Sequence, residues 1–249
     1  MDRDTARALV AEAVGTFLFF VIGMGAAASV AGAADLAALT PGGHIDPNAG
    51  LLVVALAHGV VLAILVSALG YVSGGHLNPA VTFGVWIAGK ISPVKACLYV
   101  VAQLIGAVAA GWVVIRIFFE DPWWHAAVAT RPALGAGVGM NRGLAVEAVL
   151  TFLLVLVVLG TAVDARAPKI GGLAIGLAVF VDILMGGALT GAAMNPARWF
   201  GPVVTGGSWH FENWPVWTVG PLLGGGAAAL LYRFVFATPA SAAAEPPAA

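Results

Sequence analysis

Long apolar segments alternate with short polar stretches along almost the whole chain. Six of these segments each approach the ~20 residues that a helix needs to cross a bilayer. They fall at about 8–31, 49–70, 94–118, 143–162, 170–189 and 213–236. The pattern predicts an all-α membrane protein with six transmembrane helices, built as a single membrane domain over residues 1–237.

Two shorter apolar stretches follow the second and the fifth segments, and both contain Asn-Pro-Ala. Residues 73–84 read Ser-Gly-Gly-His-Leu-Asn-Pro-Ala-Val-Thr-Phe-Gly, and residues 190–202 read Thr-Gly-Ala-Ala-Met-Asn-Pro-Ala-Arg-Trp-Phe-Gly-Pro. Asparagine can cap a helix, and proline suits the first helical position. We therefore predict two re-entrant half-helices that begin at Asn78 and Asn195. Broken backbone inside a membrane is tolerated where it is buried or lines a wet cavity, which favours a polar pore.

The two halves of the chain are related by an internal repeat. Residues 11–18 (Ala-Glu-Ala-Val-Gly-Thr-Phe-Leu) resemble residues 146–153 (Val-Glu-Ala-Val-Leu-Thr-Phe-Leu), and the first repeat covers about 5–118 and the second about 141–237. Three full spans in each repeat place the second copy upside down, so the half-helices are expected to approach from opposite faces. The last residues, 238–249, are rich in alanine and proline and are predicted to be a disordered tail.

Composition limits the kinds of partner and of chemistry. The chain is 61% hydrophobic and 9% charged, against roughly 25% charged in soluble domains. With a net charge of -1 it offers no basic face for nucleic acid. We find no nucleophile with a matching base, no metal-ligand cluster and no phosphate-binding loop, so we expect no enzyme, cofactor or metal. Cys97 excludes an internal disulfide and is expected to be a packed small residue.

Lysine and arginine predict how the chain lies in the membrane. Most of them fall on the side that both termini share, namely Arg3, Arg7, Lys90, Lys95, Arg166, Lys169 and Arg233; the other side has Arg116, Arg131 and Arg142. This bias predicts a multi-pass protein of the cell membrane with both termini in the cytoplasm. The loops at about 34–48 and 119–142 are then outside. An aromatic belt is expected at Trp123, Trp124, Trp209 and Trp214.

Two Asn-Pro-Ala half-helices in a six-span inverted repeat resemble the aquaporin, or major intrinsic protein, family, over about residues 5–237. The resemblance implies a homotetramer in membrane lipid, each subunit carrying its own pore. It places the two motifs at the centre of that pore: Asn78, Pro79 and Ala80, and Asn195, Pro196 and Ala197. The asparagine amides would donate to the passing molecule, and the two prolines would stack where the half-helices meet. His76 would lie near the cytoplasmic mouth, as a pore residue or in a structural hydrogen bond.

The same resemblance implies a narrow selectivity filter at His58, Ile183, Ala192 and Arg198. A charge at membrane depth costs about 2.5–3.5 kcal/mol on insertion scales, so Arg198 needs a wet or paired site. Strict water channels usually carry an aromatic residue and a histidine where this chain has His58 and Ile183. The set is similar to that of some plant tonoplast intrinsic proteins, which are associated with water and ammonia, and we expect a somewhat wider opening.

Three acids lie inside predicted spans. Glu12 and Glu147 resemble the family's buried pair, which accepts hydrogen bonds from the backbone of the re-entrant loops; a proton relay is the alternative role. Asp182 matches nothing in the family pattern and has no assigned role. Trp199 stands where glycerol-conducting members typically have aspartate, which argues against glycerol.

The expected function is a passive channel for water, with ammonia as a second small neutral solute, that excludes protons and ions. One alternative is a facilitator of glycerol or other small solutes. Another is a coupled secondary transporter, because inverted repeats and broken helices also occur in transporters. A transporter would need an ion site among Glu12, Glu147 and Asp182.

Overall fold

The computed structural model describes residues 2–39, 41–121, 125–164, 166–168, 170–207 and 211–237, and within these ranges it contains helices and no strand. The first half comprises α1 (Arg3–Ala38), α2 (Pro47–Ser73), α3 (Pro79–Ile87) and α4 (Pro93–Val113), which the π-helical turn η1 (Val114–Phe118) continues. The short α5 (Ala126–Ala129) follows. The second half comprises α6 (Met140–Val158) with η3 (Leu159–Val163), α7 (Gly171–Thr190), α8 (Pro196–Thr205), and α9 (Trp214–Leu231) with η4 (Tyr232–Phe236).

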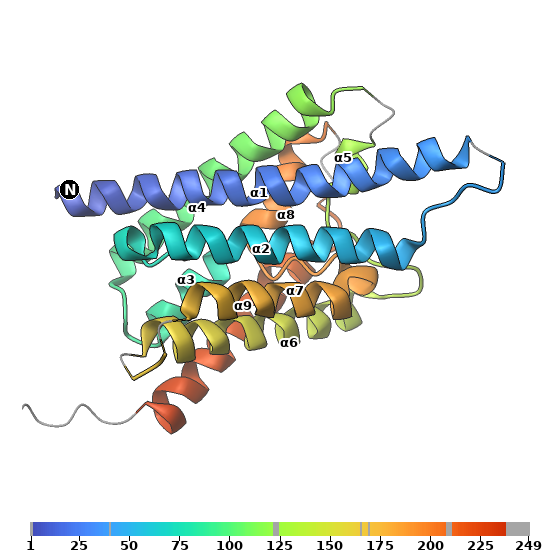
Figure 1. Cartoon of the computed structure of the whole chain (residues 1–249). Coiled ribbons are helices and arrows are strands. Elements are labelled where there is room, and N and C mark those ends of the chain that lie inside the picture. Colours follow the sequence, from blue (N-terminus) through green and yellow to red (C-terminus); the bar gives the residue numbers. More distant parts are fainter. Residues whose placement is uncertain are drawn as a thin grey trace, which may run out of the picture.

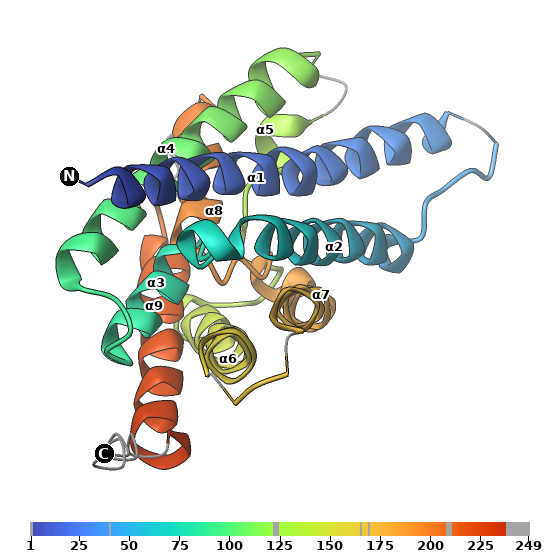
Figure 2. The same ribbon diagram turned by 60° about the vertical axis from the view of Figure 1, so that its left-hand side comes forward.

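Six of these helices are long and apolar enough to span a membrane, and α3 and α8 are the two half-helices that the sequence predicts. The start of α1 and the end of α9 lie on the same side of the molecule (Figures 1 and 2). Lys169, Trp123, Trp124, Trp209 and the predicted tail at 238–249 lie outside the described residues. Trp214 begins α9 and is 49% exposed.

The two repeats end their second spans in the same way. Gly74 after α2 and Gly191 after α7 both adopt left-handed backbone, with φ of 93° and 78°. A residue without Cβ adopts this conformation without steric strain, and it turns the chain back toward the membrane interior. Each glycine therefore starts a re-entrant loop, which leads to Asn78 in the first repeat and to Asn195 in the second.

Small residues bring the spans together in matching pairs. Helix α1 packs on α4, and α6 packs on α9. A Cβ at Gly106 would collide with the carbonyl oxygen of Ala13, and one at Gly224 with that of Ala148. These contacts are counterparts in the two repeats, and they let the helix backbones approach closely, as small residues do in membranes. Helix α2 packs against α7, and the two are neighbours in both views (Figures 1 and 2).

The first helix is longer than the hydrophobic pattern predicts. It has 36 residues, which corresponds to about 54 Å at 1.5 Å per residue, whereas the apolar core of a bilayer is about 30 Å thick. Residues 34–38, expected in a loop, continue the helix because Ala-Asp-Leu-Ala-Ala contains strong helix formers and no breaker. Asp35 on this extension contacts His125 just before α5, with 2.6 Å between Oδ2 and Nε2.

The interpretation of Cys97 as a packed residue is wrong for the single chain, because its side chain is exposed. The buried residues of α4 recur every three or four positions, at Ala96, Tyr99, Gln103 and Gly106. Cys97 falls outside that face. Its thiol points away from the core of the repeat.

Candidate functional site

Each half-helix begins at the asparagine of its motif. Asn78 Oδ1 accepts a hydrogen bond from the amide of Ala80 at 2.8 Å, and Asn195 Oδ1 accepts one from Ala197 at 3.0 Å. Pro79 and Pro196 occupy the first helical positions, where no amide hydrogen is needed. Ala80 and Ala197 are fully buried. The local sequence thus suffices to start both half-helices at these residues.

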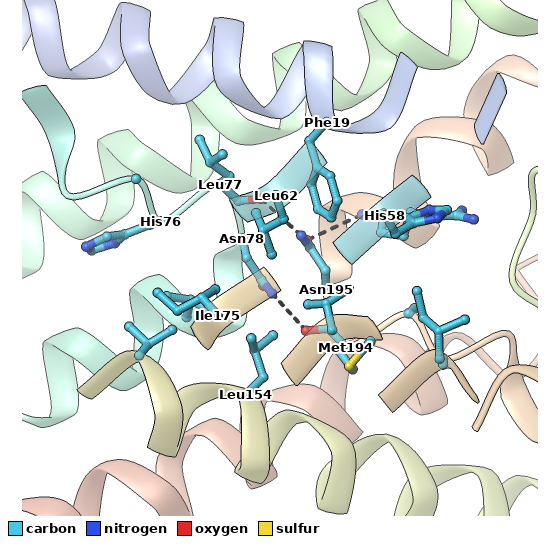
Figure 3. Close-up of a pocket in the computed structure, with 18 of the residues that line it drawn as sticks. Phe19, His58, Leu62, His76, Leu77, Asn78, Leu154, Ile175, Met194 and Asn195 are labelled. Carbon is cyan, nitrogen blue, oxygen red and sulfur yellow. Dashed lines mark hydrogen bonds between the residues drawn. The ribbon is translucent and has the colours of Figure 1, made fainter. Parts of the chain in front are cut away.

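The two asparagines also join the loops to each other. Asn78 Nδ2 donates to the carbonyl oxygen of Met194 at 2.9 Å, and Asn195 Nδ2 donates to that of Leu77 at 3.0 Å. Figure 3 shows this pair of bonds between His76 on one side and His58 on the other. A carboxamide carries two donor hydrogens. One hydrogen of each amide therefore holds the opposite loop, and one is left for a molecule in the cavity that both asparagines line.

The residues before the asparagines have an unusual backbone. Leu77 and Met194 have φ of 49° and 52°, a left-handed conformation that costs a non-glycine residue roughly 1–2 kcal/mol. Buried carboxylates hold both in place: the amide of Leu77 donates to Glu12 Oε2 at 2.7 Å, and that of Met194 to Glu147 Oε2 at 2.6 Å. Ionised carboxylates make such hydrogen bonds strong. The two glutamates therefore support the loop geometry.

The other oxygen of each glutamate completes the same arrangement in both repeats. Glu12 Oε1 accepts from the Ser73 hydroxyl at 2.6 Å and the His76 amide at 2.9 Å. In the second repeat, Glu147 Oε1 accepts from the Thr190 hydroxyl at 2.7 Å and the Ala193 amide at 2.9 Å. Both glutamates are fully buried. Their acceptor sites are thus occupied by the protein.

The first repeat adds one side chain that the second lacks. Gln103 on α4 donates through Nε2 to Glu12 Oε2 at 2.7 Å and to the Thr82 hydroxyl oxygen at 2.9 Å. Thr82 lies 3.1 Å from Nδ1 of His76, whose ring stands edge-on to Tyr99. This chain of contacts fixes the His76 ring. A polar glutamine within an apolar span is the sequence signal that could have indicated this contact.

A narrow cavity of about 40 Å³ passes the two asparagines. A buried water needs roughly 10–15 Å³ of cavity volume, so the cavity has room for about three waters. It connects His76 near one end with His58 near the other (Figure 3). Its lining includes all four predicted filter residues, namely His58, Ile183, Ala192 and Arg198. The rest of its wall is mostly apolar and includes Phe19, Leu62, Leu154, Ile175 and Val179.

His58 and Arg198 are directly paired. His58 Nδ1 lies 2.8 Å from the carbonyl oxygen of Val54, to which only a protonated nitrogen can bond. Arg198 Nε donates to His58 Nε2 at 3.4 Å, so Nε2 must supply a lone pair. These two partners together require the neutral Nδ1–H form of the imidazole. Arg198 Nη1 donates to the carbonyl oxygen of Thr130 at 2.5 Å, a contact that the sequence did not indicate.

Three further residues lie where the sequence could not place them. Trp199 is 4% exposed and stacks on Trp217, with ring centroids 6.2 Å apart, on the side away from the narrow cavity. Trp217 Nε1 donates to the carbonyl oxygen of Thr190, as the Tyr99 hydroxyl does to that of Ser73. Asp182 is 2% exposed on α7, and its Oδ2 has no hydrogen-bond partner within the described ranges.

Comparison with known proteins gives consistent matches. The model of a family described as major intrinsic protein matches residues 2–232. The chain is 44% identical to aquaporin TIP4-4 of Zea mays over 237 residues, which cover 94% of this chain and 88% of that protein. It is 42% identical to probable aquaporin TIP3-2 of Arabidopsis thaliana, over 93% of this chain and 84% of that protein. The X-ray structure of the aquaglyceroporin from Plasmodium falciparum matches with a TM-score of 0.79 at 23% identity, covering 93% of this chain and 97% of that one, which shows a shared fold.

Proposed function

The chain belongs to the major intrinsic protein family, the aquaporins, and on that basis we propose that it is a passive water channel that also conducts ammonia and excludes protons and ions. It is an integral multi-pass membrane protein and not an enzyme. The observation that carries the proposal is the pair of amide groups, Asn78 and Asn195, in a cavity wide enough for about three waters.

The geometry at the asparagines supports the proposal that water passes and ions are excluded. Two half-helices start at this point, and a helix start carries the equivalent of about +0.5 charge. Both free amide hydrogens can donate to one water oxygen in the cavity. A cation meets two positive helix ends and amide donors there, and gains no acceptor from them. A water molecule held through its oxygen also directs its hydrogens away from this point, which interrupts proton transfer along the file.

Selection is proposed to occur at His58, Ile183, Ala192 and Arg198. Arg198 is a fixed cation held by His58 and the Thr130 carbonyl, with donors left for a permeating molecule. Ile183 gives an apolar wall, and Ala192 leaves space beside it. Ammonia is close to water in size and accepts hydrogen bonds as water does, so the same file accommodates it. Trp199 is turned away from the cavity and adds no polar group for glycerol.

A passive channel accounts for the buried acids better than a coupled transporter does. Glu12 and Glu147 each accept bonds from two backbone amides and a hydroxyl in their own repeat. Transport of a coupling ion through them would require breaking the loops that they hold. Their proposed role is therefore structural.

The proposed assembly is a homotetramer with both termini in the cytoplasm of the cell. The lysine and arginine distribution supports this orientation in the cell membrane. Apolar side chains exposed on α2 and α7, such as Leu56, Ile64 and Leu177, offer surface for packing between subunits. Each subunit would keep its own cavity, because one chain supplies both half-helices and all four proposed filter residues around it.

The experiment is stopped-flow light scattering on proteoliposomes with water, ammonia and glycerol. The double variant His58→Phe with Ile183→His should keep water flux and lose ammonia flux by about tenfold or more, because it narrows the proposed filter. Trp112→Phe, at a position 55% exposed on α4, is a control and should match the unmodified protein. Water flux no faster than in empty liposomes, or flux that depends on an ion gradient, would contradict a passive water channel.

A further inference from the structure

A second, larger cavity lies behind the half-helices. It has a volume of about 610 Å³ and is bounded by α3, α4, α8 and α9. It shares no lining residue with the narrow cavity, since Pro79 and Pro196 face it where Asn78 and Asn195 face the other. Its mouth is open to the outside of the chain, because Trp86 is 39% exposed and Cys97 is exposed. The volume is in the range of ligand sites in proteins, about 300–1,000 Å³.

The walls of this cavity suit hydrocarbon. Phe83, Leu104, Phe200 and Leu222 line it, together with the two motif prolines. Its two hydroxyl groups already have partners in the protein. That of Thr82 contacts Gln103 and that of Thr218 donates to the Trp214 carbonyl. A polar ligand would therefore lose its hydration and gain few hydrogen bonds in return.

The position of the mouth determines which apolar molecule reaches it. The flanking helices α4 and α9 both span the membrane. The mouth between them therefore opens into the bilayer, whose most abundant apolar groups are acyl chains.

Basic side chains lie at the edge of this cavity, on the side of the molecule where α1 starts and α9 ends. Trp86 and Pro93 both line it, and Lys90 lies in the short connection between them. Arg233, near the end of α9, donates to the carbonyl oxygen of Ile87 at the end of α3. Neither Lys90 nor Arg233 forms an ion pair with a carboxylate in the described part of the chain. Cations at a membrane surface attract anionic lipid headgroups by about 1 kcal/mol each.

We infer that one phospholipid from the leaflet on the side of the chain ends inserts an acyl chain into this cavity and places its phosphate between Lys90 and Arg233. The acyl chain of the lipid fills the space behind Pro79 and Pro196. It thereby supports both half-helices from the side opposite the water path. The site takes an anionic phospholipid in preference to a zwitterionic one. This inference does not depend on which solutes pass through the narrow cavity.

The first test uses Cys97, the one cysteine of the sequence, as a reporter in the wall of the cavity. The purified full chain in detergent is labelled with N-ethylmaleimide while palmitoyl-oleoyl phosphatidylglycerol is added. Bound lipid covers the thiol, so the labelling rate should fall about tenfold and then level off. Palmitate alone should protect only at higher concentration, and glycerophosphoglycerol, the headgroup without chains, should not protect. Protection by the headgroup alone, or by raising the protein concentration without lipid, would overturn the inference; the latter would indicate a second copy of the chain as occupant.

The second test fills the cavity. Leu104→Trp places an indole in it, whereas Ile105→Trp, at the neighbouring residue that is 62% exposed, places the indole outside. Native mass spectrometry with phosphatidylglycerol should show one retained lipid per chain for the unmodified protein and for Ile105→Trp, and none for Leu104→Trp. Lys90→Gln with Arg233→Gln should keep the adduct but weaken it, by about fivefold for each charge. Equal lipid retention by both tryptophan variants contradicts the site. If Leu104→Trp does not fold, Cys97 protection in the unmodified chain still decides the question.

Discussion

Arg198 and His58 form a pair in which each determines the state of the other. Arg198 Nε lies 3.4 Å from His58 Nε2, and the Val54 carbonyl takes the only imidazole hydrogen. The histidine therefore acts as an acceptor for the guanidinium, and the guanidinium favours the neutral ring. Because Thr130 holds the other end of the arginine, the charge has a fixed position in the narrow cavity.

Arg198→Ala should widen the cavity and remove its fixed positive charge. We expect glycerol or urea flux to rise at least about tenfold and proton leak to appear, while water flux is retained. Proteoliposomes with an internal pH dye and a stopped-flow assay measure both. Arg142→Ala, exposed at the start of α6, is the matched control and should change neither. Unchanged selectivity in Arg198→Ala would show that selection occurs elsewhere.

Glu147→Gln should destabilise the protein, because the proposed role of Glu147 is structural and not that of a proton relay. The variant replaces one carboxylate oxygen with an NH2 donor, so either the Ala193 or the Met194 amide loses its acceptor, and an unpaired buried donor costs about 1–3 kcal/mol. Thermal unfolding in detergent should occur at lower temperature, and water flux should fall. The counterpart Glu12→Gln should behave alike, since its loop bonds match. A proton relay would instead give normal stability with loss of a flux driven by a pH gradient.

Tyr99→Phe tests one bond of the first loop. The Tyr99 hydroxyl donates to the carbonyl oxygen of Ser73 at 2.8 Å in a buried position. Its removal should cost about 1–3 kcal/mol of unfolding free energy, since the carbonyl is left without that partner. Tyr71→Phe is the control, because Tyr71 is 86% exposed. Equal unfolding temperatures for the two variants would show that the Tyr99 bond is not needed.

Mercurial reagents should have little effect on water flux through the narrow cavity of the unmodified protein. Ala192 lines that cavity without a thiol, and Cys97 lies outside it. Ala192→Cys combined with Cys97→Ser should make water flux sensitive to mercuric chloride, with inhibition reversed by a thiol reductant. Cys97→Ser alone is the reference. Lack of inhibition in the combined variant would place Ala192 away from the water path.

The connection between η3 and α7, inside the second repeat, should show acid sensitivity. Hydrogen bonds from the Arg166 side chain, at 2.9 and 2.6 Å, hold the pKa of the Asp164 carboxyl well below its ordinary value of 3.8. A carboxyl group whose pKa is lower in the folded than in the unfolded state stabilises the fold at pH values above its unfolded pKa. This contribution to stability is therefore constant from pH 7 to about 5 and is lost as the pH falls below about 3.8. It is small, because the Arg166 side chain is 55% exposed. Unfolding temperatures at several pH values should fall less steeply in acid for Arg166→Met than for the unmodified chain.

The sequence predicted the elements that depend on local rules. Span positions follow from runs of apolar residues, and half-helix starts follow from asparagine before proline, which is why α3 and α8 begin where expected. Glu12 and Glu147 were identified because the repeat aligns them and because a carboxylate is costly inside a span. The cavity also gathers His58, Ile183, Ala192 and Arg198, and their role as a selectivity filter stays a prediction from the family resemblance.

Other features depend on contacts that no local pattern encodes. The Thr130 carbonyl reaches Arg198 only because the chain after α5 returns over the cavity, and a backbone group has no signature in sequence. The exposure of Cys97 depends on which face of α4 packs inward. The sequence placed the end of α1 too early, because the hydropathy of the chain falls after about residue 31 while its helix propensity stays high to Ala38. Asp182 has no explanation in the structure either.

The hydrogen bonds from Asn78 to Met194 and from Asn195 to Leu77 also constrain how the protein is made. Met194, the partner of Asn78, follows it by 116 residues. At a synthesis rate of about 5–20 residues per second, the ribosome needs roughly 6 to 23 s to reach it. During that interval the first half of the chain is in the membrane with the Asn78 amide and the Leu77 carbonyl lacking their native partners. Arrival of the second half supplies the missing bonds to both loops at once, so biogenesis of the water path is a single late event.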